Sequence, residues 1–243
     1  MKLNVTIPVY NEEKVLEQSI CTLNNFLEKE FSKYDWEILV ADNASIDKTL
    51  EVAKILKNKY EKVDYIHLDQ KGRGRALKRA WTESDADIVS YMDVDLSTRL
   101  EHLPEMIAGM VKGNYSIATG SRLMKNSKTK RSFKREFISR SYNILVKSLF
   151  FTKFSDAQCG FKAVTREVVN KIIVPYVEDT GWFFDSELLI IGEKLGYKIL
   201  DIPVEWVEDL DSRVKIIKTA VDDIKGLLRV KSNFMKSVYK NGR

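Results

Sequence analysis

The sequence contains little cysteine, proline and histidine. Among its 243 residues are two cysteines, four prolines and two histidines. Cys21 and Cys159 lie far apart, which argues against a disulfide framework and against a cysteine-based zinc site, so we expect two free thiols. His67 and His102 have no partner at metal-ligand spacing, and a structural role is the better interpretation of both.

Long apolar runs are also absent. No segment reaches the roughly 18 apolar residues that a membrane-spanning helix requires. The first residues, MKLNVTIPVYNEE, enter a strand-like run without the apolar core of a signal peptide. We therefore expect a cytoplasmic protein, which can still lie peripherally on the cytoplasmic face of a membrane. The net charge of +5 is small for this length, so the distribution of charge is more informative than its sum.

Short apolar runs alternate with amphipathic segments along the first half of the chain. The predicted strands are 3–8, 36–41, 63–68, 87–92 and 115–120. The predicted helices between them are 12–28, 47–59, 73–83 and 100–112. This alternation indicates an α/β protein with a mostly parallel sheet, built from βαβ units and flanked by helices.

The second half of the chain is less regular. Helices are predicted at 165–173 and 184–195, a strand at 198–206, and an amphipathic tail from about residue 213. Neither a linker nor an internal repeat interrupts the sequence. We therefore expect a single domain over residues 1–243.

Acidic residues follow two predicted strands at the point where each strand ends. Strand 36–41 leads into Asp42, and strand 87–92 leads into Asp93-Val94-Asp95. A single such aspartate is usually a turn or cap residue, but an open parallel sheet binds its ligands beyond the carboxyl ends of its strands. Carboxylates two residues apart in a loop can share one Mg²⁺ or Mn²⁺ with substrate phosphates, and the ion would neutralise a diphosphate leaving group.

A basic, glycine-spaced turn precedes the predicted helix 73–83. Its sequence, KGRGRALKRAW at 71–81, combines cations with a helix N-terminus, an arrangement that suits phosphate binding. It fits neither the P-loop spacing nor G-x-G-x-x-G. Taken alone, a solvent-exposed turn is an equally good interpretation.

A series of motifs runs along nearly the whole chain. In the front half these are IPVYNEE at 7–13, ADNASIDKT at 41–49, GRGRALKRA at 72–80, MDVDLS at 92–97 and ATGSRL at 118–123. In the back half they are DAQCGFKAVTREV at 156–168, GWFFDSELL at 181–189 and IPVEWVEDLDSRVKIIKTAVDDIKGL at 202–227. Together they resemble the family-2 inverting glycosyltransferases of the GT-A fold, and among these the polyprenyl-phosphate sugar synthases, especially the dolichyl-phosphate glucosyltransferase type. Asn43-Ala44 departs from the commoner Asp-Gly, and the segment 212–215 lacks the mannose synthases' Arg-x-x-Gly-x-Ser-Lys.

The resemblance implies a nucleotide-sugar-binding half at 1–121 and an acceptor-facing half at 122–243. It implies nucleotide contacts for Pro8, Tyr10, Glu12, Asp42, Lys71, Gly74 and Asp93, and metal contacts for Asp93 and Asp95. It implies phosphate contacts for Arg122 and Arg213. On the acceptor side it implies roles for Asp156, Gln158, Gly160, Asp185 and Glu187. Trp182, which lies next to Gly181 in the acceptor motif, is a further candidate for contact with the substrate. The implied cofactor is Mg²⁺ or Mn²⁺.

The implied reaction is the transfer of a hexose, with UDP-glucose as the expected donor and dolichyl phosphate as the expected acceptor. A phosphate acceptor is already anionic near neutral pH, so a strong general base is unnecessary, although Asp156 is a candidate for orienting the acceptor or acting as a base. We expect inversion at the anomeric carbon by direct displacement. The alternatives are GDP-mannose as donor, a glycan as acceptor, and a catalytically silent nucleotide-sugar-binding protein, which the intact Asp93-Val94-Asp95 disfavours.

Basic residues gather in the segment 123–151. The segment contains eight basic residues and a single acidic one, Glu136. Its apolar residues Ile138, Tyr142, Leu145 and Leu149 recur at helical spacing. We expect this segment to lie on an anionic membrane surface. For the tail, 213–240, an apolar stripe packed on the core is an equally good interpretation. A nucleic-acid partner is not expected, because the aromatic residues form an apolar face; a homo-oligomer is left open.

Overall fold

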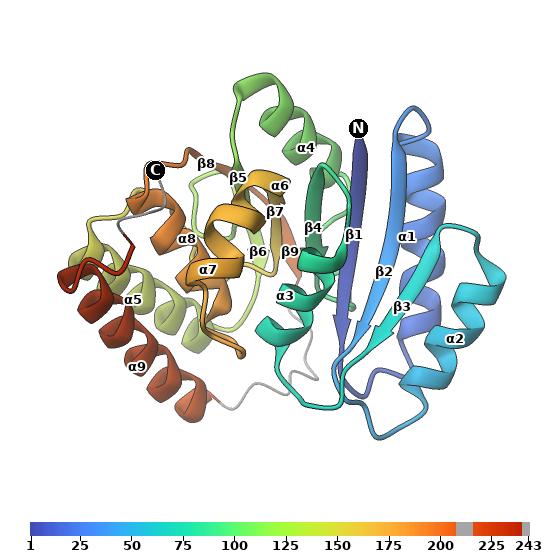
Figure 1. Ribbon diagram of the computed structural model, residues 1–243, viewed down its shortest axis with the longest axis horizontal. Helices are drawn as coiled ribbons and strands as arrows, with labels where there is room; N and C mark the ends of the chain where they lie inside the picture. Colours follow the sequence, from blue (N-terminus) through green and yellow to red (C-terminus); the bar gives the residue numbers. More distant parts are fainter. Residues whose placement is uncertain (208–215, 240–243) are drawn as a thin grey trace.

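The computed structural model of the protein describes residues 1–207 and 216–239. A seven-stranded sheet with helices on both faces is its main feature (Figure 1). The strands of this sheet are β1 (Lys2–Val9), β2 (Asp35–Asp42), β3 (Val63–His67), β4 (Ile88–Met92), β5 (Ile117–Ser121), β7 (Phe161–Thr165) and β8 (Ile199–Pro203). Two short strands, β6 (Lys128–Lys130) and β9 (Glu205–Val207), pair in a second sheet.

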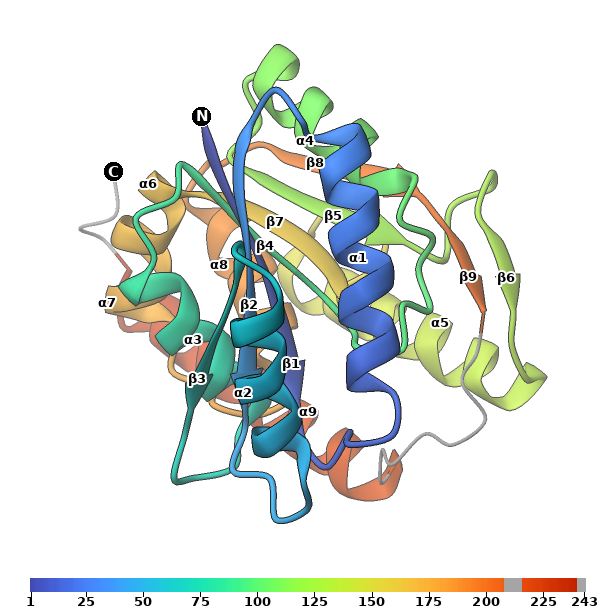
Figure 2. The ribbon, with the colours of Figure 1, turned by 90° about the vertical axis from the view of Figure 1, so that its right-hand side faces the viewer.

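The helices cover the sheet from both sides. The longer ones are α1 (Leu16–Glu30), α2 (Thr49–Lys59), α3 (Arg73–Glu83), α4 (His102–Gly113), α5 (Phe133–Phe150), α8 (Phe184–Lys194) and α9 (Ile216–Met235). Between β7 and α8 lie the short turns α6 (Arg166–Val168), η1 (Val169–Ile173) and α7 (Val174–Tyr176). Figure 2 shows α1 on one side of the sheet and α3 and α8 on the other.

The strand order of the large sheet is β3-β2-β1-β4-β7-β5-β8. Neighbouring strands are parallel except at β7, which runs antiparallel to both β4 and β5. The prediction of a mostly parallel sheet flanked by helices is confirmed. Because both faces are covered, the central strands are buried along nearly their whole length, as in β4, where all five residues of Ile88–Met92 are buried.

Two apolar clusters form the core, one on each face of the sheet. The first joins the sheet to α1, α2 and α4, and the second joins it to α3, η1, α5, α8 and α9. Successive residues of β2 alternate between them: Ile38 and Val40 belong to the first cluster and Ala41 to the second. This two-sided packing fixes the sheet and hence the loops at its edges.

The sequence pattern does not reveal β7. The motif DAQCGFKAV interrupts its apolar residues with Gly160 and Lys162, which are unusual choices for a central strand. Lys162 is nevertheless fully buried, and its Nζ donates to the Cys159 carbonyl at 2.5 Å and lies 3.3 Å from Asp185 Oδ1. Because the buried and paired Lys162 interrupts the apolar pattern, the sequence does not predict β7, the strand that lies between β4 and β5.

Other boundaries follow the sequence closely. Helix α3 begins and ends where the spacing predicts, whereas the predicted strand 198–206 is divided into β8 and β9. The division occurs because β9 leaves the large sheet and pairs with β6. Cys21 and Cys159 are both free thiols. Within residues 1–207 and 216–239, no helix combines the length and the apolar character needed to cross a bilayer.

Three residues other than glycine adopt a left-handed backbone near the carboxyl ends of β1, β2 and β4. They are Asn11 (φ 57°), Ala44 (φ 60°) and Leu96 (φ 50°). Ala44 occupies the position at which the resembled family commonly has glycine, and its φ explains that preference, because a Cβ is unfavourable there. Two of these, Ala44 and Leu96, carry a side chain that disfavours this conformation, so the edge at which they lie holds some backbone strain.

We expect Ala44→Gly to stabilise the protein by about 1 kcal/mol, because it removes a Cβ from a left-handed residue. The change should raise the melting temperature by roughly 2–4 °C, measured by thermal and urea unfolding. Asn114→Gly is the matched control: Asn114 also has a positive φ, but asparagine tolerates it and the gain should be smaller. An Ala44→Gly protein no more stable than the wild type would contradict this explanation.

Candidate functional site

The candidate site lies at the carboxyl edge of the central strands. β1 lies between β2 and β4, and Val9 at its end is paired with Asp42 at the end of β2. The arrowheads of these strands point to the lower edge of the molecule in Figure 1. Asp93 and Asp95 follow β4 at the same edge. The topology therefore brings the acidic residues singled out in the sequence to one edge of the sheet.

Asp93 is partly exposed and lies between groups of two other segments, α3 and the segment before β7. Its Oδ1 accepts a hydrogen bond from Arg73 Nη2 at 2.6 Å. Its Oδ2 lies against Gly160, where an added Cβ would approach to 1.9 Å. Burial raises the pKa of Asp93, Arg73 opposes that rise, and the nearby Asp95 adds to it. The carboxylate is thus held at a fixed position by a cation on one side and a glycine on the other.

Asp95 is exposed and turned into its own loop. Its Oδ1 accepts the backbone N–H of Ser97 at 3.0 Å. Across residues 1–207 and 216–239, no three His, Cys, Asp or Glu side chains cluster as an all-protein metal site would require. Two carboxylates nevertheless suffice for Mg²⁺ or Mn²⁺ when substrate phosphates complete the shell. The guanidinium already beside Asp93 shows that this position suits a cation, so the residues present fit a divalent ion.

Sequence reasoning missed Arg73. It lies within the basic turn, but the resemblance drew attention to Lys71 and Gly74 instead. Lys71 Nζ lies 3.3 Å from the centroid of the Tyr10 ring, which brings two predicted nucleotide contacts together. Gly74 packs against the acceptor-side segment: its N–H donates to the Gly181 carbonyl at 3.1 Å, and a Cβ there would collide with Phe184. Gly74 therefore allows α3 to approach the acceptor-side segment closely.

Asp42 is fully buried and has two partners. Its Oδ2 lies 2.6 Å from His67 Nδ1, and its Oδ1 accepts the Ser45 N–H at 3.2 Å. The neighbouring Asn43 accepts the N–H of Gly72 at 2.6 Å and so joins this loop to the basic turn. His67 thus has a structural role, as expected, and that role is to hold Asp42.

The remaining nucleotide-side residues lie at the end of β1 and on the loop after it. Pro8 is paired with Ala41 in the sheet. Tyr10 lies beneath Lys71, and the N–H of Glu12 donates to Thr49 Oγ1 at 2.7 Å. Arg213, the other predicted phosphate contact, lies outside the described residues.

Arg122 and Asp156 form a fully engaged ion pair. Arg122 Nε and Nη2 donate to the two carboxylate oxygens at 2.8 and 3.0 Å, and the Arg122 N–H adds a third bond at 3.1 Å. Burial tends to raise the pKa of Asp156, but Arg122 outweighs it and holds the pKa at about 2. A carboxylate so weakly basic and so fully paired is unsuited to remove a proton. The geometry therefore favours Asp156 as an anchor for Arg122 over Asp156 as a general base.

The predicted acceptor-side carboxylates on α8 are both buried. Asp185 accepts a hydrogen bond from the Tyr91 hydroxyl and lies 3.3 Å from Lys162 Nζ. Glu187 accepts the N–H groups of residues 178 and 179 at 3.0 and 2.7 Å, and burial raises its pKa to about 7. These partners hold the segment before α8, from which Trp182 projects with 45% of its surface exposed.

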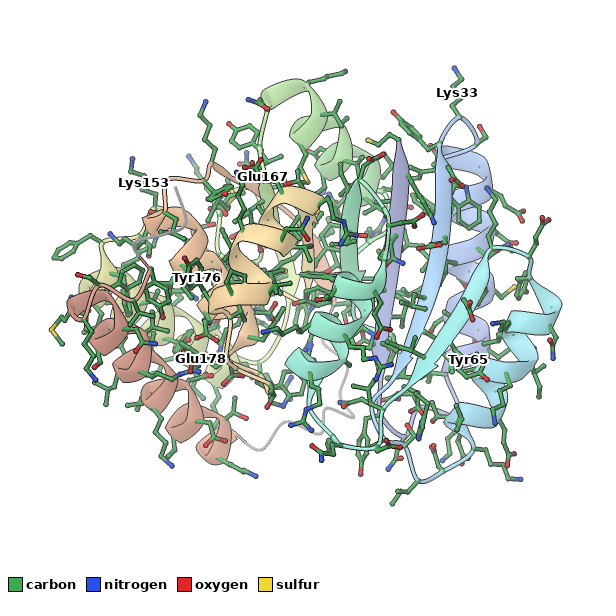
Figure 3. The ribbon with its side chains drawn as sticks, viewed as in Figure 1. Lys33, Tyr65, Lys153, Glu167, Tyr176 and Glu178 are labelled. Atoms are coloured by element: carbon green, nitrogen blue, oxygen red, sulfur yellow. The ribbon has the colours of Figure 1, made fainter. Side chains whose placement is uncertain are left out.

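Helix α9 contributes contacts that the sequence did not predict. Asp223, which is 3% exposed, accepts a hydrogen bond from Gln158 Nε2 at 2.8 Å, and burial raises its pKa to about 7. Arg229 pairs with Glu187 at 3.0 Å and with Glu178 at 3.0 Å. Figure 3 shows Glu178 beside α9. The last helix therefore supports the acceptor-side motif directly.

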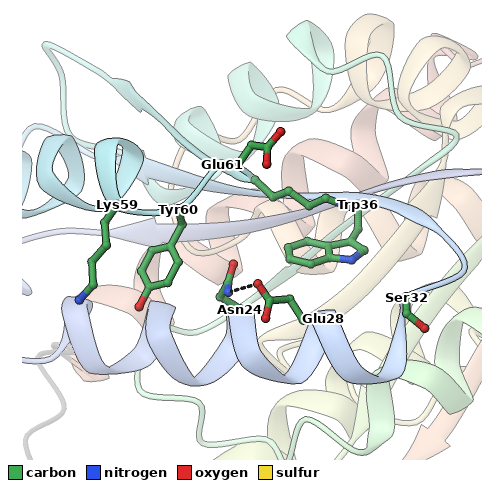
Figure 4. A pocket seen from close by; sticks show the side chains of 8 residues that line it. Asn24, Glu28, Ser32, Trp36, Lys59, Tyr60 and Glu61 are labelled. Carbon is green, nitrogen blue, oxygen red and sulfur yellow. Dashed lines mark hydrogen bonds between the residues drawn. The ribbon is translucent and has the colours of Figure 1, made fainter.

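A separate hollow lies away from these residues. It has a volume of about 320 Å³ and lies between the end of α1 and the segment after α2 (Figure 4). Trp36, near the start of β2, lies in its wall, and Lys62 Nζ is 4.5 Å from the Trp36 ring. This is the opposite edge of the sheet from Asp93, so the hollow is not part of the candidate site.

Comparison with known proteins assigns the family. The model of glycosyl transferase family 2 matches residues 4–173, which is more than half of the chain. The chain belongs to glycosyl transferase family 2. This glycosyltransferase is 34% identical over 219 residues to AglD of Haloferax volcanii. The match covers 90% of this chain but 35% of AglD, so this chain spans about a third of the length of AglD. It is also 34% identical over 235 residues to a dolichyl-phosphate beta-glucosyltransferase of Trichomonas vaginalis, covering 92% of this chain and 72% of that enzyme.

Solved structures show the same fold. Glucosyl-3-phosphoglycerate synthase from Mycobacterium tuberculosis, in complex with Mn²⁺, uridine-diphosphate-glucose and phosphoglyceric acid, matches this glycosyltransferase with a TM-score of 0.73 at 18% identity. The match covers 95% of this chain and 80% of that one. The predicted GT-A fold is thereby confirmed.

Proposed function

We propose that this glycosyltransferase transfers a glucosyl group from UDP-glucose to a polyprenyl phosphate such as dolichyl phosphate. The observation that carries the proposal is the pair Asp93 and Asp95 at the carboxyl edge of the sheet, with Asp93 lying against Gly160 of the acceptor motif. The named dolichyl-phosphate beta-glucosyltransferases among its relatives support the choice of sugar and acceptor. The structural neighbour crystallised with Mn²⁺ and uridine-diphosphate-glucose supports the choice of donor and metal.

The residues divide the work between donor and acceptor. Asp93 and Asp95 would hold Mg²⁺ or Mn²⁺, which supplies positive charge to the diphosphate as it leaves. Tyr10 and Lys71 lie on the nucleotide side of these carboxylates, and Arg122, held by Asp156, lies on the acceptor side. Positioning and charge stabilisation would then provide most of the catalysis.

The proposed step is a single displacement with inversion. A phosphate oxygen of the acceptor forms a bond to the anomeric carbon while the bond from that carbon to the diphosphate oxygen breaks, and UDP departs with the electron pair. The acceptor is already ionised near neutral pH, so no proton has to be removed. The engagement of Asp156 by Arg122 agrees with a reaction that needs no general base.

The experiment is a transfer assay with labelled UDP-glucose, UDP-N-acetylglucosamine and GDP-mannose, each offered with dolichyl or undecaprenyl phosphate and Mn²⁺ or Mg²⁺. We expect label from UDP-glucose to enter the lipid fraction as a β-linked product. Preferential use of GDP-mannose would refute the assignment of UDP-glucose as the donor. Transfer only to a glycan would refute the assignment of a polyprenyl phosphate as the acceptor. A product with retained configuration would refute the displacement.

We also propose that α5 and α9 lie on the cytoplasmic face of an anionic membrane, where the lipid acceptor is met. The structure corrects half of the predicted stripe of α5: Tyr142 and Leu149 pack on the core, whereas Leu145 is exposed. A second apolar stripe is exposed, comprising Phe133 (85% exposed), Phe137 (65%) and Ile144 (67%) on the same helix and Phe151 (79%) directly after it. On α9 the exposed apolar residues are Val221, Ile224, Leu228 and Met235.

The two helices lie side by side, on the side of the molecule away from β3 (Figure 1). They contact each other through the rings of Phe150 and Phe234, and Lys231 Nζ donates to the Leu149 carbonyl at 2.9 Å. Exposed lysines flank both stripes, which suits an anionic interface.

Substituting serine for both Phe133 and Phe137 should abolish most sedimentation with vesicles containing phosphatidylglycerol, because it removes apolar area that the bilayer would bury. The fold should be retained, since both side chains are exposed. Equal sedimentation of the wild type and this variant would argue against the proposed surface, as would equal binding to neutral vesicles.

A further inference from the structure

Arg73 occupies an unusual position for a cation next to proposed metal ligands. Its Nη2 lies 2.6 Å from Asp93 Oδ1, and the side chain is only 13% exposed. The guanidinium carbon lies 4.7 Å from the centroid of the Trp182 ring and 5.1 Å from that of Tyr91. Two aromatic rings therefore hold the cation in place on the carboxylate.

The guanidinium is not fully satisfied in this position. Its Nε is buried and has no hydrogen-bond partner among the described residues. Arginine recognises carboxylates and phosphates through several parallel N–H groups, and an unpaired buried donor is unfavourable. Arg73 thus has unused capacity for a further oxygen acceptor within the site.

The backbone around Arg73 is fixed, so the guanidinium can move only by its side-chain torsions. The N–H of Gly72 donates to Asn43 Oδ1 at 2.6 Å. The N–H of Gly74 donates to the Gly181 carbonyl at 3.1 Å. These bonds tie the turn to both the nucleotide side and the acceptor side, so a change in the position of the guanidinium has to come from the torsions of the Arg73 side chain.

We propose that Arg73 and the divalent ion compete for Asp93, and that the donor's diphosphate resolves the competition by taking over the guanidinium. Without nucleotide, Arg73 neutralises Asp93 and opposes metal binding. When the nucleotide and ion enter together, the ion takes Asp93 and Arg73 turns to the phosphate oxygens. Arg73 is then a positioning residue that makes metal and nucleotide binding cooperative. This inference rests on the metal role of Asp93 and Asp95 proposed above.

The physical reason is that two cations cannot share one carboxylate oxygen without strong mutual repulsion. A diphosphate removes that conflict because it offers the guanidinium new anionic partners. By linkage, the factor by which nucleotide tightens metal binding equals the factor by which metal tightens nucleotide binding. That common factor is the quantity to measure.

The experiment measures Mn²⁺ binding by the electron paramagnetic resonance signal of free Mn²⁺, with and without UDP. In Arg73→Gln, Mn²⁺ alone should bind about tenfold more tightly than in the wild type, and the factor by which UDP tightens it should fall about tenfold. Arg79→Gln is the matched control: it removes the same charge from the same helix, where Arg79 pairs with the exposed Glu83. It should leave both quantities unchanged.

Arg73→Lys guards against a folding defect in the first variant. It keeps the charge, so it should keep Mn²⁺ affinity within about threefold of the wild type and retain the coupling. Unchanged Mn²⁺ affinity and coupling in Arg73→Gln would overturn the inference while leaving the metal role intact. Equal weakening of Mn²⁺ and UDP binding would also overturn it, since that marks a structural role. Wild-type UDP affinity that is independent of Mn²⁺ would overturn the metal role itself, and the inference with it.

Discussion

Gly160→Ala is expected to lower the rate of sugar transfer about 100-fold while leaving the protein folded. A Cβ at this position would lie 1.9 Å from Asp93 Oδ2 and 2.7 Å from Asp93 Cγ. The atom it meets is the end of a side chain, so the carboxylate can turn away and the fold need not open. That turn removes Asp93 from the position proposed for metal binding.

The measurement compares kcat/KM with the free energy of unfolding for the same variant. Gly109→Ala is the matched control: its Cβ would approach another side-chain end, Leu200 Cδ2, to 2.6 Å, but on α4 and among core residues. The control should lose some stability and keep its activity. If Gly160→Ala retained wild-type activity, the close approach of Asp93 to Gly160 would have no role in catalysis.

Asp156→Asn is expected to destabilise the protein by about 3–5 kcal/mol at pH 7, because it leaves the buried Arg122 without its counter-charge. The same reasoning does not apply to exposed pairs. Glu83→Gln, which breaks the exposed pair with Arg79, should therefore cost less than about 1 kcal/mol. Urea unfolding of both variants provides the comparison.

The pH dependence gives a second test of this pair. The pKa of Asp156 is about 2 in the folded protein, below the ordinary value of 3.8. The ionised carboxylate therefore contributes its full stability above about pH 4, and that contribution is lost as the pH falls towards 2. Asp156→Asn should lose less stability than the wild type over this interval. If Asp156→Asn instead lost turnover while its free energy of unfolding stayed unchanged, a general-base role of Asp156 would be supported.

The fold could be predicted well where the apolar residues follow the regular spacing of strands and helices. The alternation of apolar strands and amphipathic helices gave the parallel half of the sheet, including the limits of α3. β7 could not be predicted in this way, because Lys162 is buried at its centre and is balanced by Asp185, a residue on a distant helix. Strand periodicity cannot reveal a charge whose partner comes from elsewhere in the chain.

In the candidate site, too, some residues could be placed from the sequence and others could not. Asp42 and Asp93 could be placed together from topology alone, because both follow strands that end at one edge. Arg122 and Asp156 were singled out separately, but their pairing depends on two loops 34 residues apart. Arg73 and Asp223 were missed for a related reason: each looks like an ordinary charged residue of a helix until its partner is known.

Asp95→Ala tests the central claim most directly, because the exposed carboxylate of Asp95 contributes little to the fold and is proposed to act through the metal. Its kcat/KM for transfer from UDP-glucose to dolichyl phosphate should fall about 1,000-fold, which corresponds to about 4 kcal/mol of lost transition-state stabilisation. Asp64→Ala, which removes an exposed carboxylate paired with Lys57, should remain as active as the wild type. An Asp95→Ala enzyme that kept full activity with Mn²⁺ or Mg²⁺ would contradict the account.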